Sequence, residues 1–434
     1  MLDRDLMLDK ELSYSETNDV KTKKSIIVSL LVILVYLENM QLVPILGTSL
    51  KPHHLVFIYA VLFVMLYKKY VSRVRTAIAI VALVLPMLPL YRISDQMEWV
   101  KSYVIWGIAT IYFAWAFPWI NEKFQENRTY YIKLFIYLAL LIQTVSVIQF
   151  AIMNTTGNIF LRNLFGPLQY IKPYVSTKNG IYRAFSVFHE PSVLGWVNSS
   201  ALAVVLYTGK ENLFSKKILV FFHILCAATM ICSLSAVGMI GYLAVWSVYA
   251  LNNAKNKKSF FGIVIGIVVL IYLWNFTLIL DPLRRITSEV DTVNTSGYER
   301  LNAPRQFALK TLRYYPFLGR GIGQSGDVDL VGTISTAISQ EANNSLYQMI
   351  MNLGLSSIIL VVIFVHSMLE RIKYDRDYWL IAINVLVIFL STGAYLSLDF
   401  AAVLNVLLLV YKGREVSDEE DFMGVQYSDS ADSQ

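Results

Sequence analysis

The sequence predicts an all-α polytopic integral membrane protein with about twelve transmembrane helices and two long external loops that carry short interfacial helices. Hydrophobic residues make up 56% of the 434 residues and charged residues only 16%, whereas a soluble domain has about one-quarter charged residues. The apolar residues also gather in runs that approach the ~20 residues needed to cross a bilayer. The net charge of +6 is therefore a guide to membrane sidedness, and no nucleic-acid partner is expected.

The predicted spans follow a polar N-terminal segment, residues 1–24, of mixed charge. The first span, from Ser25 to about Ile45, is expected to act as an uncleaved signal anchor, because residues 1–24 are too long and too acidic for the n-region of a cleavable signal peptide. It begins a transmembrane domain that extends over residues 25–411. The other spans are expected at 55–67, 76–90, 103–119, 132–153, 192–208, 218–232, 236–251, 260–279, 345–366, 378–394 and 397–411.

Lysine and arginine are distributed unequally between the short loops on the two predicted sides. Sixteen lie in the five short loops on one side, and three, Lys51, Arg92 and Lys101, lie on the other. Short cytoplasmic loops are enriched in these residues, so the first set is expected inside, together with both termini. The C-terminal segment 412–434 has only acidic charges after Arg414, which is typical of a disordered cytoplasmic tail.

Two loops on the predicted outer side, 154–191 and 280–344, are long, and each contains a basic stretch. Long loops escape the charge rule, so their cations are free to serve another purpose. Within the second loop, residues 298–313 mix apolar and aromatic residues with arginines, which is typical of a helix along a membrane surface. These arginines can bind an anionic substrate or anionic lipid headgroups, and the sequence leaves both readings open.

The stretch from Arg183 to Asn198 places an arginine, a histidine and a glutamate directly before an apolar helix. Pro191 disfavours a helical conformation of the preceding Glu190 but is tolerated in a first helical turn. The helix is therefore expected to begin near Ser192, with Glu190 extended just before it. Glu190 is then either a helix cap or a group that takes part in chemistry, and its position alone leaves both open.

Basic outer loops with a carboxylate and an imidazole nearby suit a lipid-linked diphosphate as substrate. Arginine pairs with phosphate oxygens through two parallel hydrogen bonds. In a glycosyl transfer from such a donor, cations stabilise the charge that develops on the leaving diphosphate. The carboxylate of Glu190 or the imidazole of His189 can take the proton of the acceptor hydroxyl.

Other polar residues are weaker candidates. Glu38 lies within the first span, and a carboxylate inside a membrane is a functional candidate by default. Asp327 and Asp329 have the spacing of a metal-binding pair but are expected to face away from cytoplasmic nucleotide sugars, so no metal is predicted. His53 and His54 lack further ligands nearby and are interpreted as interfacial. No nucleotide-binding or hydrolase motif occurs in the sequence, and no cofactor is predicted.

Four segments together carry a resemblance to a known family. They are an arginine followed by a β-like run and Glu-Pro at Arg183–Gly195, a serine-rich junction at Cys232–Gly241, a Glu-Arg pair and a Pro-x-x-Gly-x-Gly turn within Glu299–Gly323, and a span start at Glu341–Gly354. These features resemble the Wzy-type polysaccharide polymerases and O-antigen ligases, which are membrane glycosyltransferases of the bacterial envelope. The ligases have His-Asn where this chain has Asn343 and Asn344, which favours the polymerases.

The resemblance implies a polymerase that joins polyprenyl-diphosphate-linked oligosaccharide repeat units on the outer face of the bacterial plasma membrane. The product is a surface polysaccharide of the capsule, exopolysaccharide or O-antigen type. In this scheme Glu190 or His189 acts as the base or positions the acceptor, and Glu38, Asn343 and Asn344 are further candidates. The arginines expected to bind the diphosphate are Arg183, Arg300, Arg305 and Arg313.

The resemblance also implies the bilayer, a flippase and a chain-length regulator as partners. Two alternatives remain open on the sequence: a glycan ligase, and a transporter or flippase of lipid-linked sugars. A transporter is expected to show internal repeats and paired broken spans, and the sequence shows no convincing repeat.

Overall fold

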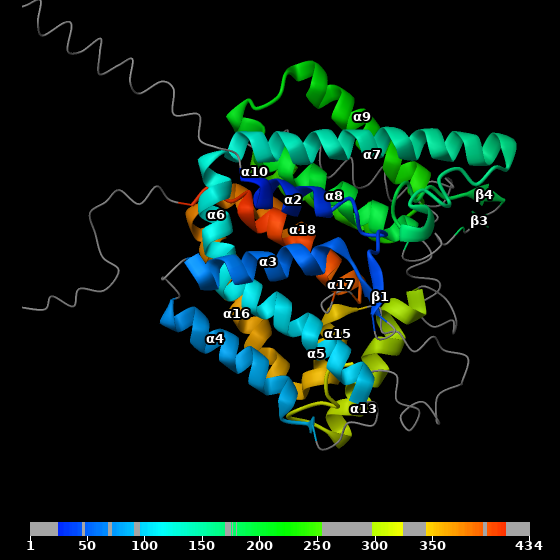
Figure 1. Cartoon of the computed structure of the whole chain (residues 1–434). Helices are drawn as coiled ribbons and strands as arrows, with labels where there is room; N and C mark the ends of the chain where they lie inside the picture. Colours follow the sequence, from blue (N-terminus) through cyan, green and yellow to red (C-terminus); the bar gives the residue numbers. More distant parts are fainter. Residues whose placement is uncertain are drawn as a thin grey trace, which may run out of the picture.

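The protein is a bundle of helices with two short β-hairpins, as a computed structural model shows (Figure 1). The structure describes residues 25–45, 48–67, 72–90, 96–169, 175, 177–178, 180–253, 297–323, 344–393 and 397–413. Several predictions fall outside these residues, namely those for residues 1–24, the span 260–279, Asp327, Asp329, Asn343 and residues 414–434.

The chain passes through the bundle in three described stretches. The first comprises α2 (Ile26–Leu34), β1 (Val43–Ile45), β2 (Thr48–Leu50), α3 (Pro52–Tyr67), α4 (Arg73–Val84), the 3-10 helix η1 (Leu85–Met87), α5 (Gln96–Ile111), the π-helix η3 (Tyr112–Ala116), α6 (Phe117–Glu126) and α7 (Arg128–Thr156). The second comprises the 3-10 helix η4 (Gly166–Leu168), β3 (Thr177–Lys178), β4 (Ile181–Tyr182), α8 (Pro191–Tyr207), the 3-10 helix η5 (Gly209–Glu211), α9 (Lys216–Ser233) and α10 (Ala236–Asn253). The third comprises the π-helix η7 (Tyr298–Asn302), α13 (Ala303–Tyr314), α15 (Ser345–Leu353), the 3-10 helix η8 (Gly354–Ser356), α16 (Ser357–Tyr374), the 3-10 helix η9 (Arg376–Tyr378), α17 (Trp379–Ser391) and α18 (Leu398–Leu409).

Most predicted spans in the described chain coincide with a helix. Local signals set the helix ends: α7 ends at Gly157, whose φ of 69° is the left-handed conformation of a glycine C-cap, and α8 begins with Pro191. The helical stretches long and apolar enough to cross a membrane are Gln96–Glu126, Arg128–Thr156, Lys216–Ser233 and Ser345–Tyr374. The fold class is thus helical and membrane-embedded, and the number of about twelve spans stays a prediction.

The prediction of one continuous span from Ser25 to about Ile45 is wrong. Helix α2 ends at Leu34, and the chain then continues into the hairpin of β1 and β2. Between these elements the backbone pairs with a distant loop, because the N–H of Gln41 donates to the carbonyl of Leu168 at 2.7 Å. Two polar residues, Glu38 and Asn39, are buried in this segment and need polar partners, which a helix surrounded by lipid would not supply.

The predicted span 345–366 is also interrupted, at Gly354. The backbone there has a φ of 61°, and a Cβ on this glycine would lie 2.6 Å from the backbone nitrogen of Gly319. The turn that contains Gly319 pairs with the interruption, since the N–H of Leu355 donates to the carbonyl of Pro316 at 2.7 Å. The Pro-x-x-Gly-x-Gly turn therefore has a structural role: it splits this stretch into α15 and α16.

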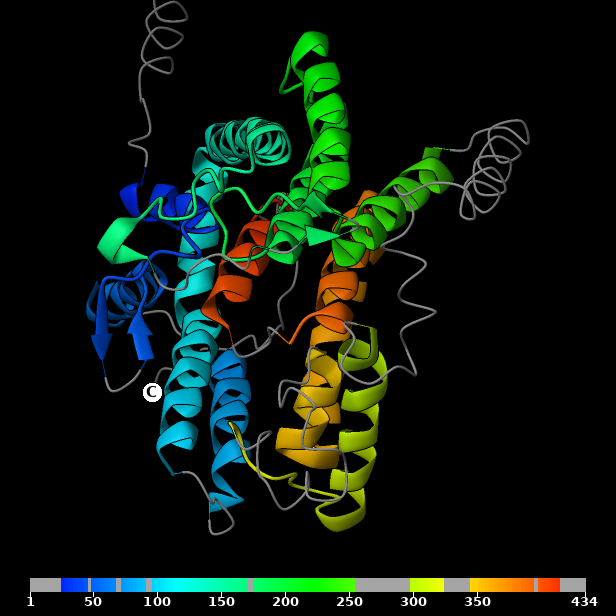
Figure 2. The same cartoon turned by 90° about the vertical axis from the view of Figure 1, so that its right-hand side faces the viewer.

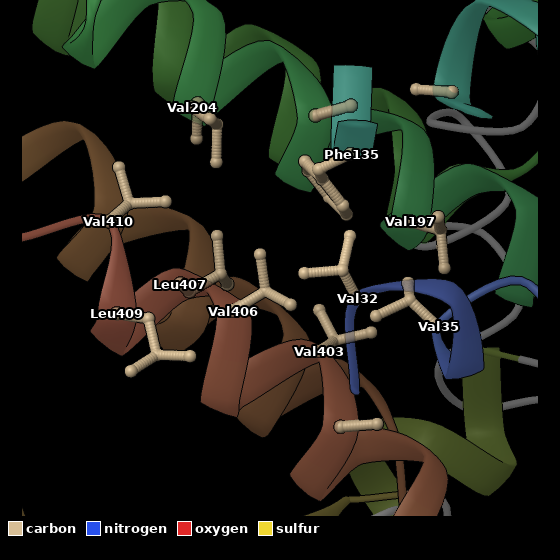
Figure 3. Close-up of a cluster of buried hydrophobic side chains, with 14 of the residues drawn as sticks. Val32, Val35, Phe135, Val197, Val204, Val403, Val406, Leu407, Leu409 and Val410 are labelled. Carbon is tan, nitrogen blue, oxygen red and sulfur yellow. The ribbon is translucent and has the colours of Figure 1, made fainter. Parts of the chain in front are cut away.

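Helix α8 lies at the centre of the main hydrophobic core. All of its residues are buried, and it carries no charged side chain, as expected of a helix at the centre of a core. Figure 3 shows Val197 and Val204 of α8 in one cluster with Val32 of α2, Phe135 of α7 and Leu407 of α18, which are all buried. The core therefore joins segments from both ends of the sequence around the helix that follows Glu190.

Small residues bring α8 and α10 into backbone contact. A Cβ on Gly238 would lie 2.6 Å from the Cα of Gly195, and one on Gly241 would lie 2.8 Å from the Oγ of Ser199. Close approach through small residues is a common packing mode of membrane helices. It fixes the N-terminal turns of α8 against the first turns of α10.

The segment 298–313, predicted as an interfacial helix, is helical as η7 and α13. Its apolar face, with Tyr298 and Phe307, packs on Met351 of α15 in a small separate core. Helices α13 and α15 lie side by side in both views of the bundle (Figures 1 and 2). Arg305 and Arg313 are exposed on α13. Its position on the outer membrane surface stays a prediction.

One end of the bundle brings together helix ends that carry cations of the predicted inner loops. We call this the basic end and define it by Arg128, Tyr207, Lys210, Glu211, Asp375 and Asp377. Arg128 pairs with Glu211, Lys210 pairs with Asp377, and the Tyr207 hydroxyl donates to Asp375 at 2.6 Å. These contacts show that the loops lie on the same side as one another, as the charge pattern predicts. Their cytoplasmic location stays a prediction.

Candidate functional site: a buried ion cluster

Five ionisable side chains from four separate segments meet away from the basic end. We call them the ion cluster: Glu38, Lys51, His53, His189 and Asp399. The ammonium of Lys51 lies 2.7 Å from Oδ2 of Asp399 and 3.5 Å from Oε1 of Glu38. The imidazoles lie on the two sides, with Nδ1 of His189 2.7 Å from Oε1 of Glu38 and Nδ1 of His53 3.4 Å from Oδ1 of Asp399.

The ion cluster is enclosed by the helix ends that supply it. Glu38 lies beyond α2, Lys51 and His53 are at the start of α3, and Asp399 is in the first turn of α18. The side chain of Glu38 is 4% exposed, whereas that of His189 is 29% exposed. Ionisable groups are almost never fully buried unless they are paired. His189 is the most exposed member of the ion cluster, ahead of Asp399 at 16%.

His189 is held by one carboxylate at two points. Glu38 contacts the ring at Nδ1, and its other oxygen accepts the backbone N–H of His189 at 3.4 Å. The Nδ1 atom is itself buried, so the exposed part of the ring lies elsewhere on it. Burial by itself lowers the pKa of His189, but the contact with Glu38 and the negative charges of Glu38 and Glu190 outweigh it and raise that pKa above its ordinary value.

The loop before His189 is fixed by Gln149 of α7. The buried amide oxygen of Gln149 accepts the N–H groups of Phe185 and Ser186 at 2.9 and 2.6 Å, and its nitrogen donates to the carbonyl of Phe160 at 2.8 Å. Ser186 has a φ of 56°, which few residues other than glycine adopt. Such a strained turn persists only where its surroundings hold it, and here it sets the direction of the chain towards His189.

Glu190 has the conformation that the proline predicts. It is extended, with φ and ψ of −148° and 156°, and α8 begins at Pro191, one residue before the expected Ser192. Its carboxylate accepts a hydrogen bond from the Ser192 hydroxyl. In the described chain, that carboxylate accepts no backbone N–H of α8, so Glu190 occupies the cap position without a backbone capping bond. Its chemical role stays a prediction.

Arg183 lies at the junction between α9 and α10. Its Nε donates to the carbonyl of Ser233 at 2.9 Å, and the next backbone N–H, of Ala184, donates to the carbonyl of Cys232 at 2.9 Å. A cation is favoured beside the carbonyls at a helix C-terminus. The structure thus brings together two of the four segments that carried the family resemblance.

Arg300 and Asn344 meet at the C-terminal end of α17. Arg300 donates to the carbonyl of Ser391, and the side chain of Asn344 donates to the carbonyl of Leu390. The oxygen of Asn344 also accepts the N–H of Tyr347 at 3.2 Å and caps α15. Arg300 is therefore anchored, as Arg183 is, while the exposed Arg305 and Arg313 extend from α13.

Sequence reasoning found Glu38 and His189 but missed their partners Lys51, His53 and Asp399. His53, interpreted from the sequence as interfacial, is wholly buried within the protein, and its Nε2 lies 2.8 Å from the carbonyl of Leu34. One signal was present in the sequence, because Asp399 is the only acidic residue of the apolar run 397–411. The rule that selected Glu38 would also have selected Asp399.

These features define a helical integral membrane protein with a buried, charged site at the ends of its helices. Among the described residues, no group of three or more His, Cys, Asp and Glu could hold a metal ion. The family model of the WcaD colanic acid polymerase matches residues 25–413, so the chain belongs to this family. No curated protein matches the sequence significantly.

Membership of this family assigns the activity. The protein polymerises lipid-linked repeat units into an exopolysaccharide, which makes it a membrane enzyme of the glycosyltransferase type. The predicted resemblance to the Wzy-type polymerases is confirmed at this level. The match gives no support to the ligase or transporter alternatives.

Proposed function

We propose that the protein extends its polysaccharide on the outer face of the bacterial plasma membrane, with polyprenyl-diphosphate-linked oligosaccharides as donor and acceptor and with His189 as the base. The observation that carries this proposal is the pairing of His189 with buried Glu38, because an oriented imidazole with an exposed edge is suited to proton transfer. A flippase would deliver the repeat units, and a chain-length regulator would act with the polymerase.

The reaction transfers the growing chain to the incoming unit. The acceptor hydroxyl oxygen attacks the anomeric carbon of the donor sugar, and the bond from that carbon to the diphosphate oxygen breaks. The electron pair of that bond leaves with the polyprenyl diphosphate, while His189 takes the hydroxyl proton and later releases it to water. The products are a longer chain on the acceptor lipid and a free polyprenyl diphosphate.

The arginines divide into two groups in this scheme. Arg183 and Arg300 are anchored on carbonyls at helix C-termini, so their guanidinium groups are held in place before substrate binds. Such preorganised cations suit the charge that develops on the leaving diphosphate. Arg305 and Arg313 are exposed on α13 and are suited to a first, looser contact with the same diphosphate.

The test of the base is polymerisation by purified variants supplied with lipid-linked repeat units. His189→Gln is expected to insert normally and to lose on the order of 100- to 10,000-fold in rate, the usual contribution of a general base. Glu190→Gln is expected to make little polymer as well, because Glu190 adjoins His189 and adds to its basicity. A wild-type rate for His189→Gln with a large loss for Glu190→Gln would move the base to Glu190.

The anchored and exposed arginines are compared by lysine substitution. Arg300→Lys is expected to retain little of the polymerisation rate, because an ammonium cannot both hold the Ser391 carbonyl and reproduce a two-pronged phosphate contact. Arg305→Lys is expected to retain more of the rate. Full activity of Arg300→Lys and Arg300→Ala at normal protein levels would reduce Arg300 to a structural anchor.

Membrane orientation is tested with single cysteines in a variant that lacks the native Cys226 and Cys232. A cysteine at exposed Asn158 is expected to react with a membrane-impermeant thiol reagent in whole cells, and one at exposed Lys210 of the basic end is not. The reverse labelling pattern would contradict the proposed location of the site on the outer face of the membrane.

The step that the protein performs is tested in the cell. Lipid-linked glycans from a deletion strain should be single repeat units, whereas polymer stranded on its lipid would indicate a ligase.

A further inference from the structure

A chain of ion contacts leads from α18 to the proposed base. It runs from Asp399 through Lys51 and Glu38 to His189, with steps of 2.7, 3.5 and 2.7 Å. Lys51 is the central member, since its ammonium contacts both carboxylates and its side chain is only 10% exposed. Two residues that the family match does not assign, Lys51 and Asp399, are therefore electrostatically connected to the reaction through Glu38.

The charges of this chain are coupled to the proton on His189. With ionised carboxylates and a protonated Lys51, the formal charge of Asp399, Lys51, Glu38 and neutral His189 is −1, and it becomes zero when His189 accepts a proton. Removing net charge from a poorly solvated site is favourable. The reaction that makes His189 cationic therefore also neutralises its buried partners.

Glu38, Glu190 and Lys51 act on His189 directly, and Asp399, His53 and His54 adjoin Lys51. Glu190 adjoins His189 in its loop, Glu38 comes from the segment after α2, and α18 contributes Asp399. Lys51, His53 and His54 come from the start of α3. Gln149 of α7 holds the loop and is uncharged.

We propose that Lys51 and Asp399 are positioning residues for the polymerisation reaction, which act through Glu38 to place and polarise the His189 imidazole. This inference rests on the proposed role of His189 as the base. Lys51 fixes the Glu38 carboxylate against the ring, and Asp399 at the start of α18 fixes Lys51. Lys51 and Asp399 also contribute opposite charges to the surroundings of His189. Removal of Lys51 therefore favours the proton on His189, and removal of Asp399 disfavours it.

Charge-changing variants have opposite expected effects. The acid limb of the rate profile is the fall in rate at low pH, where the base His189 is protonated. Asp399→Asn leaves the positive charge of Lys51 less balanced and disfavours the proton on His189. The acid limb therefore moves to lower pH. Lys51→Met leaves more negative charge near the ring and moves the acid limb to higher pH. The double variant Lys51→Met/Asp399→Asn has the wild-type net charge, so its acid limb is expected nearer to the wild-type position than that of either single variant.

The maximal rate of each single variant is expected to fall on the order of 100-fold, because a displaced catalytic group is costly. Lys51→Arg should recover part of this loss. The matched controls are Lys210→Met, Asp377→Asn and their double variant, which make the same charge changes at the basic end and are expected to leave the acid limb in place. Single variants of the ion cluster that shift the limb in the same direction, or not at all, would overturn the proposal.

A second measurement does not depend on activity. The rate at which diethyl pyrocarbonate modifies His189, followed by mass spectrometry of the protein in detergent, reports its protonation as a function of pH. The same opposite shifts are expected in Asp399→Asn and Lys51→Met, and their absence overturns the inference even if His189 is the base. Conversely, shifted modification profiles with a wild-type rate for His189→Gln would overturn the proposed base and leave the ion chain standing.

Discussion

The two ends of the helix bundle both hold ion pairs, but in different surroundings. At the basic end, Lys210 is 77% exposed and its partner Asp377 is 23% exposed, whereas Glu38 and Lys51 of the ion cluster are 4% and 10% exposed. An exposed pair contributes only about 0–1 kcal/mol. Buried ions lose their hydration, and this loss can exceed what their mutual attraction returns. Neither set of ions is therefore expected to contribute much to stability, and a chemical role is proposed only for the buried set.

Arg128 shows that a buried charge at the basic end has a different role. It is buried, donates through Nε and Nη2 to the carbonyl of Val410 at 3.2 and 2.9 Å, and pairs with Glu211. These contacts tie the end of α18 and the loop after α8 to the start of α7. By contrast, the ion cluster contains a partly exposed imidazole, and this exposure is the feature on which the proposed reactive role of His189 rests.

The largest expected effect is a difference in polymerisation rate between variants at the two ends of the bundle. Glu38→Gln keeps the shape of the side chain but removes the charge that faces His189, so polymerisation in vitro should fall on the order of 100-fold. Asp377→Asn makes the same chemical change at the basic end and should leave the rate within about twofold, as expected of a surface pair. Equal rates for the two variants would erase the functional difference between the ends.

The next effect should appear in stability at the basic end. Arg128→Met removes two hydrogen bonds to the Val410 carbonyl and should lower the free energy of unfolding by about 3 kcal/mol. The measurement is thermal unfolding in detergent, alongside the polymerisation rate per folded molecule. A variant that keeps wild-type stability but loses activity would show that the basic end takes part in the reaction.

A smaller effect should come from the close contact between helices α8 and α10. Gly238→Ala places a methyl group 2.6 Å from the backbone of Gly195 and should cost about 2 kcal/mol through separation of α8 and α10. Exposed Gly209 has open space around it, so Gly209→Ala is the matched control and should leave thermal unfolding nearly unchanged. Loss of stability in the control alone would contradict the packing described for α8.

The smallest effect is expected at the exposed pair. Lys210→Met should change the free energy of unfolding by less than about 1 kcal/mol, and that change should shrink further in high salt. Thermal unfolding at low and high ionic strength measures both. A large, salt-independent loss would mean that Lys210 is buried in an interface.

The sequence by itself determined the features that depend on composition and on neighbouring residues. The low charge content determined the membrane class, Pro191 determined the extended Glu190 and the start of α8, and the charge of Glu38 inside an apolar run marked it as a candidate. The interruption at Gly354 could not be predicted, because it depends on the distant turn at Pro316. The low charge content, Pro191 and the charge of Glu38, by contrast, are local signals, so they can be read without knowledge of the fold.

Only the tertiary structure decided which residues accompany His189. Lys51 and Asp399 are 348 residues apart in the chain, and Glu38 and His189 are 151 apart. A lysine in a short loop and a histidine at the start of a helix show no sign of burial in their own sequence. Their surroundings arise when α2, α3 and α18 pack around α8, because burial and charge pairing are properties of the assembled helices and of no single segment.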